Sequence, residues 1–194
     1  MRSPEYDLRY IDAGMEILEN YLLSDEVFWL ININPPLGEP EYPGLTLDWI
    51  LLAKTRLAGH RISPDQKDQV EQVNSKLEFI RSKWRVAWEQ KASQCYQVRG
   101  RMWRNFIQEY QDNPQENADR YGYEVRLRVM LELLKSEFKH QNNAHEDELS
   151  SLDGYIKEVL VPNAFIWDPE IQAGFPEHVY WYLYSKLPPN PKVK

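Results

Sequence analysis

A Glu-x-x-His pair is the clearest metal-ligand pattern in this sequence: it joins Glu137 to His140, and His145 follows five residues later. Di-iron helical bundles use two such pairs together with two further glutamates that face inward. This chain has no second Glu-x-x-His pair, and spacing alone does not bring ligands together. We therefore expect no metal at Glu137, His140 and His145, and no other cofactor.

Lys91 has the chemistry of a nucleophile, because a lysine removed from water loses its proton more easily. It falls on the apolar face of a predicted helix, where an unpaired ammonium is costly. Three outcomes would avoid this cost: local exposure of the helix, a stem that extends to a rim, or pairing with a carboxylate. We favour pairing, with Asp12, Glu16 or Glu19. No nucleophile–base signature accompanies it, so we expect no catalytic residues and favour a protein that is not an enzyme.

Tryptophans and basic residues are interleaved over residues 82–105, as they are on surfaces that bind nucleic acid. On a helix that advances about 100° per residue, Arg81, Arg85 and Arg99 fall on one rim, whereas Lys83 and Arg101 fall on the other. This scatter and a net charge of −7 disfavour nucleic-acid binding. A nucleic-acid surface at Arg81, Arg85 and Arg99 is the weakest of three functional hypotheses.

The C-terminal quarter of the chain is unusually rich in aromatic residues. Tyrosine and tryptophan anchor interfaces because they are large, stiff and polar at one tip. Some of these side chains are expected to close the end of a helical bundle and others to meet a ligand or partner. The expected binding residues, with Lys91, are Trp167, Phe175, Tyr180, Trp181 and Tyr184.

The elements that must position these residues are helices, since apolar residues recur at helical spacing and no strand alternation is evident. The sequence predicts an all-α, elongated helical bundle built on a long antiparallel helix hairpin, with a Pro-rich loop and an aromatic-rich C-terminal helical segment. The hairpin pairs a helix at 64–112 with one at 115–140. The Pro-rich loop covers 34–44, and residues 26–31 are read as a short helix. One domain spans 1–187, followed by a tail at 188–194.

The long helix carries an apolar stripe with an eleven-residue period. Val73, Trp84, Cys95 and Phe106 lie near one line, so we expect all four to be buried. Thr46 and Ser63 are expected to cap helices, Gly59 to end one, and Gly100 to be the weak point of the long helix. Unbroken, this helix is about 72 Å long and its partner about 38 Å, so a second copy could cover the excess stripe.

Charge and hydropathy bound the remaining possibilities. Residues 1–50 carry ten acids and two bases, whereas residues 76–104 carry eight bases and two acids. Without a long apolar run or a signal-like N-terminus, we expect a cytoplasmic protein that does not bind membranes. The favoured function is a non-catalytic protein–protein interaction or assembly module with an unidentified protein partner. The alternative is a small-molecule-binding or catalytic pocket lined by the aromatic C-terminal segment.

Overall fold

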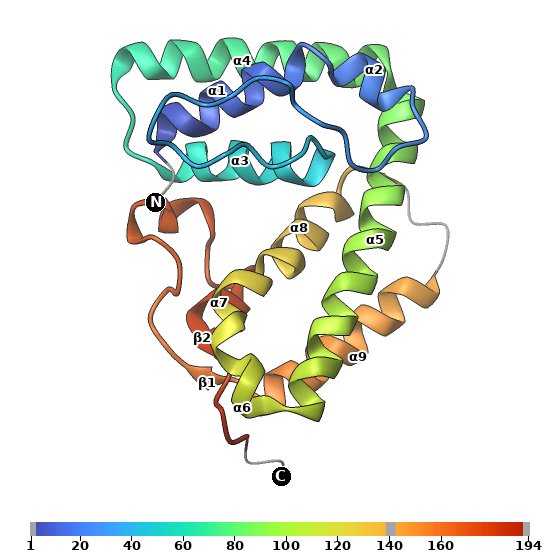
Figure 1. Ribbon diagram of the computed structural model, residues 1–194, viewed down its shortest axis with the longest axis vertical. Coiled ribbons are helices and arrows are strands. Elements are labelled where there is room, and N and C mark those ends of the chain that lie inside the picture. Colours follow the sequence, from blue (N-terminus) through green and yellow to red (C-terminus); the bar gives the residue numbers. More distant parts are fainter. Residues whose placement is uncertain (1–2, 139–142, 192–194) are drawn as a thin grey trace.

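Three of the first four helices begin at a side chain that caps them. The computed structural model describes residues 3–138 and 143–191 (Figure 1). Side-chain oxygens of Ser3, Thr46 and Ser63 accept backbone N–H groups of the first turn, and Ser63 forms a capping box with Gln66. The predicted caps at Thr46 and Ser63 are confirmed. These four helices are α1 (Pro4–Met15), α2 (Leu18–Leu22), α3 (Leu47–Gly59) and α4 (Pro64–Lys83).

The helical pattern over 64–112 forms two helices instead of one. α4 ends at Lys83, and α5 (Arg85–Asp112) begins after Trp84, whose backbone leaves helical geometry at φ −113° and ψ 34°. Figure 1 shows the chain turning sharply between α4 and α5. The prediction of a single helix with its weak point at Gly100 is therefore wrong, because Gly100 lies inside α5.

The predicted partner helix over 115–140 is divided as well. Its longest piece packs along α5, but an uninterrupted antiparallel hairpin is not what the chain forms. The all-α class itself is confirmed, since the only strands in the described ranges are two short ones. The helical pieces after α5 are α6 (Pro114–Asn117), η1 (Ala118–Arg120), α7 (Tyr121–Glu124), α8 (Arg126–Lys135) and α9 (Asn143–Val159).

The break between α4 and α5 removes the reason for predicting self-association, which was an unbroken helix over 64–112. α5 has 28 residues and is about 42 Å long, far shorter than the single helix from which an uncovered stripe was inferred. A homo-oligomer formed through a long helix stays an untested prediction. Over the described part of the chain, no helix combines the length and apolarity that crossing a bilayer requires.

The aromatic C-terminal segment is not α-helical, which corrects the sequence prediction. It forms two 3₁₀ turns, η2 (Pro169–Gly174) and η3 (Trp181–Tyr184), and a short antiparallel pair of β1 (Val161–Pro162) with β2 (Ser185–Lys186). Aromatic side chains lose rotamer freedom in a helix, so their helix propensity is modest. Tyr182 and Leu183 are adjacent and both fully buried, so the segment is held by contacts on several sides.

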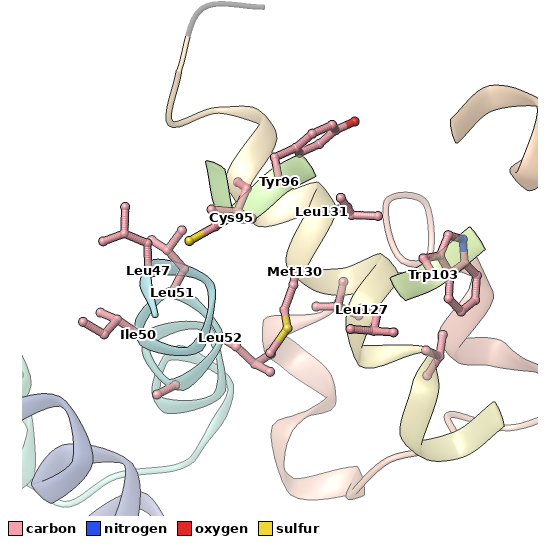
Figure 2. Close-up of a cluster of buried hydrophobic side chains, with 14 of the residues drawn as sticks. Leu47, Ile50, Leu51, Leu52, Cys95, Tyr96, Trp103, Leu127, Met130 and Leu131 are labelled. Atoms are coloured by element: carbon pink, nitrogen blue, oxygen red, sulfur yellow. The ribbon is translucent and has the colours of Figure 1, made fainter. Parts of the chain in front are cut away.

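α3 lies at the centre of the molecule. It packs against α1 on one side and against α8 and η2 on the other. Figure 2 shows the core between them, where leucines of α3 meet side chains of α5 and α8. Gly59, at the end of α3, lies against the backbone of η2, where an added Cβ would be 2.4 Å from the carbonyl oxygen of Ile171. The predicted helix end at Gly59 is confirmed, and close packing explains the glycine.

Candidate functional site

A long segment without helix joins α2 to α3. We call residues 23–46 the strap; Figure 1 shows it passing over α1 and α3. Connections of this length without secondary structure are uncommon in compact domains, and they are usually functional or disordered. Whether the strap is disordered or held in place can be read from its contacts with the rest of the protein.

Lys91 of α5 anchors the start of the strap. Lys91 is 1% exposed, and its ammonium donates to the carbonyl oxygens of Ser24 at 2.7 Å and Glu26 at 2.8 Å and lies 4.7 Å from the centre of the Tyr21 ring. Burial lowers the pKa of Lys91. The Tyr21 hydroxyl adds a hydrogen bond to the carbonyl oxygen of Val27 at 3.0 Å.

The expected carboxylate partner of Lys91 is therefore wrong. Of the three candidates, Glu19 pairs instead with Lys83 of α4 at 3.0 Å. The ammonium of Lys91 thus meets backbone carbonyls of the strap, and not the carboxylate of Asp12, Glu16 or Glu19. A buried ammonium needs hydrogen bonds, and carbonyl dipoles supply them here.

The rest of the strap is fixed by contacts with α1, with α5 and with itself. Trp29 and Leu45 form an isolated antiparallel bridge, with N···O distances of 3.1 and 2.7 Å. The Tyr6 hydroxyl donates to the carbonyl oxygen of Glu41 at 3.0 Å, and Arg9 pairs with Glu39. The guanidinium of Arg99 lies 5.1 Å from the centre of the Phe28 ring. The strap is thus a positioned segment, held at both ends.

Apolar side chains project from the strap into solvent. Its exposed large residues range from 42% exposure for Ile33 to 78% for Leu30 and full exposure for Leu37. Between Val27 and Gly38 the strap has no charged residue, although 27% of the chain is charged. Exposed apolar side chains on a positioned segment make the strap a candidate interaction surface. The five exposed apolar residues of the strap are Leu23, Phe28, Leu30, Ile33 and Leu37.

Sequence reasoning missed this surface. It predicted a short helix over 26–31, whereas Val27, Trp29 and Ile31 pack on the core and the residues between them point outward. The signal was the uncharged run from Val27 onward, followed by two prolines.

The expected aromatic site residues do not form one surface. Phe175 and Tyr180 are buried and pack edge to face, so neither is available to a partner. The Tyr184 hydroxyl donates to the carbonyl oxygen of Phe175 at 2.8 Å. Trp181 is half-buried beside Lys157, whose ammonium lies 4.9 Å from an indole ring centre.

Trp167 lines a groove of about 490 Å³ between α3, α7 and η2. Its indole N–H donates to the carbonyl oxygen of Gly122 at 2.9 Å. The guanidinium carbon of Arg126 lies 3.4 Å from the centre of the Tyr123 ring, and burial lowers the pKa of this guanidinium. Asp168 caps η2 through one carboxylate oxygen, and its other oxygen is buried with no hydrogen-bond partner among the described residues. The groove is a second candidate site.

The three arginines of the nucleic-acid hypothesis are each engaged within the protein. Arg81 pairs with Glu137 at 2.9 Å, and Arg85 pairs with Glu89 at 3.0 Å. Arg99 is buried and paired with Asp48, so it is not a rim cation available to phosphate. Arg81 and Arg85 line one groove, but Glu78, Glu89 and Glu137 line it too, and Arg99 does not.

The residues of the metal hypothesis are only partly described. Glu137 accepts the indole N–H of Trp88 at 2.9 Å in addition to its pair with Arg81. His140 and the side chain of His145 lie outside the described residues. Cys95 is buried, and burial raises the pKa of its thiol to about 12, so the thiol is protonated at neutral pH.

Replacing Lys91 by methionine is expected to lower the free energy of unfolding by about 1–3 kcal/mol, because carbonyl groups lose their donor. Hydrogen exchange of the amides of residues 24–27 should accelerate at the same time. Lys83→Met, which removes an exposed lysine, is the control and should leave strap exchange unchanged. Denaturant unfolding and exchange measured by mass spectrometry check both, and unchanged exchange in Lys91→Met would show that Lys91 does not anchor the strap.

Comparison of the chain with protein-family models, with curated proteins and with solved structures gave no match, so its function has to be argued from these sites.

Proposed function

We propose that this protein is a non-catalytic protein–protein interaction module that contacts its partner through the strap. The observation that carries the proposal is the row of exposed apolar side chains on a segment held at both ends. Large apolar side chains that leave water on binding supply most of the free energy of association. A contact segment that is already positioned loses little conformational freedom when the partner binds.

A small molecule bound in the groove at Trp167 is the second candidate. It is supported by the unpartnered carboxylate oxygen of Asp168. Most other polar groups there are already engaged: Trp167 with Gly122, Arg126 with Glu124, and Arg56 with Asp7. The groove therefore offers few groups to orient a ligand, whereas the strap exposes five large apolar side chains.

The strap is expected to be required for partner binding. In the variant Leu30→Asp, Leu37→Asp, two charges replace exposed apolar contacts, so capture of the partner should fall at least tenfold. The measurement is quantitative mass spectrometry of proteins retained from a lysate by the immobilised full chain and by the variant. Because both side chains are exposed, the melting temperature should be unchanged.

The matched control is Phe79→Asp, Val86→Asp, which makes the same chemical change at two exposed apolar residues of α4 and α5, outside the strap. This variant should retain the partner at the level of the parent chain. Loss of the partner from the control with retention by the strap variant would place the contact on α4 and α5 and refute the proposal.

A further inference from the structure

The backbone of the strap has an unpaired edge. Trp29 exchanges two hydrogen bonds with Leu45, as antiparallel strands do. In such a pair, a neighbouring extended residue directs its N–H and C=O groups toward the opposite edge, so Leu30 points its groups away from Leu45. Among the described hydrogen bonds, none uses the backbone of residue 28 or of residues 30–34. We call this part of the strap, residues 28–34, the free edge.

The free edge lacks the features by which proteins protect exposed strands. Natural edge strands carry charged side chains, prolines or bulges that prevent pairing with another chain. Here the protection is confined to Pro35 and Pro36, where the free edge ends. From Val27 to Ile31 the side chains alternate between the core, as at Trp29, and solvent, as at Leu30, and residues 32–34 are all exposed. This is the surface to which an added strand pairs in β-augmentation.

The charges around the free edge select the partner. The whole strap contains four acids and no base, and between residues 10 and 50 the chain has no lysine or arginine. Asp25, Glu26 and Glu41 are exposed on either side of the uncharged run. Two copies of this chain would bring like charges together, whereas lysine and arginine beside an apolar strand would be attracted.

We propose that the strap binds its partner as an extended strand that pairs with the free edge, and that this strand alternates apolar residues and is flanked by lysine or arginine. The proposal rests on the proposed function and names the form of the partner. A strand of seven residues spans about 23 Å and matches the length of the free edge. Its main-chain hydrogen bonds give affinity, its apolar side chains meet Phe28 and Leu30, and its basic flanks face the acids of the strap.

The probe is a displayed library of random nine-residue peptides, selected on the full-length protein and counter-selected on the variant Leu30→Asp, Ile33→Asp. We expect selected sequences with apolar residues at alternate positions and with lysine or arginine at the ends. Their affinity for the protein, measured by fluorescence polarisation, should fall as ionic strength rises, since the flanking attraction is screened.

Backbone pairing is tested by single N-methylation along one selected peptide. A methyl group on an amide that faces the free edge should weaken binding at least tenfold, and one on the next amide less than twofold, with this alternation along the peptide. The proposal is overturned if the library yields no binder, if selected peptides bind as helices, or if N-methylation shows no alternation. A dimer that Leu30→Asp, Ile33→Asp abolishes would assign the free edge to a second copy and also overturn it.

These outcomes separate the inference from the proposed function. If the strap variant with Leu37→Asp loses the protein partner but no extended basic peptide is selected, the interaction module stands and strand pairing falls. If selected strands bind as expected but the strap variant keeps its protein partner, the free edge binds peptides without being the contact of the module.

Discussion

Replacing Trp88 by alanine is expected to lower the free energy of unfolding by about 3–5 kcal/mol, the usual loss for a buried aromatic residue. Trp88 is fully buried in the first turn of α5, and its indole N–H donates to Glu137 at 2.9 Å. Removing the indole opens a cavity beside the turn between α4 and α5. It also leaves the Glu137 carboxylate with Arg81 but without its buried donor. Urea denaturation of the two proteins measures the loss.

Trp84→Ala is the matched comparison, because Trp84 is half-buried and lies four residues earlier, at the break itself. The loss should be no more than about half of that for Trp88, in proportion to the apolar area removed from water. Equal losses for the two substitutions would mean that Trp84 is a core residue, as the helical stripe predicted. They would also contradict the half-buried position that the break gives it.

The apolar stripe shows how far helical spacing carries a prediction. Val73, Cys95 and Phe106 are buried as expected, because the stripe is continuous on both sides of the break. The break could not be located from the sequence, since no proline or glycine marks Trp84. At Gly100 an added Cβ would meet nothing within 4 Å. A glycine lowers helix stability by only about 1 kcal/mol, so packing of α5 against its neighbours decides the outcome.

Lys91 shows a second limit of sequence reasoning. Its place on the buried face of a helix was predicted from angular position and is confirmed. Its partners could not be predicted, because they are the backbone carbonyl oxygens of Ser24 and Glu26. Every residue type has such an oxygen, so the sequence does not mark which ones bind Lys91. The acidic residues of the N-terminal helices suggested a carboxylate partner for Lys91. In the fold, backbone carbonyl oxygens of the strap accept its hydrogen bonds instead.

The strap was the part of the candidate site furthest from prediction. Short apolar runs are ambiguous between helix and strand, and the apolar residues at 27–31 fit both periods. The uncharged run and the two prolines that follow are the features that favour extended structure. What fixed the segment in place lies elsewhere in the chain, in Tyr6, Tyr21 and Lys91, whose roles depend on contacts across the fold.

Asp48→Ala is also expected to destabilise the protein by about 3–5 kcal/mol, because it leaves the buried guanidinium of Arg99 without its counter-charge. Asp48 of α3 is fully buried and pairs with Arg99 of α5, which also donates to the Thr46 hydroxyl at 3.4 Å. The double variant Asp48→Leu, Arg99→Met removes both charges and should recover most of the loss, since a buried ion pair offsets its desolvation only in part.

The control for this prediction is Glu89→Ala, which breaks the more exposed pair with Arg85 and should cost under about 1 kcal/mol. Guanidinium salt screens ion pairs, so the free energies should be compared by urea denaturation. A loss in Asp48→Ala no larger than that in Glu89→Ala would show that Arg99 reaches solvent. Arg99 would then be accessible to a phosphate group. That result would support the hypothesis that Arg81, Arg85 and Arg99 bind nucleic acid.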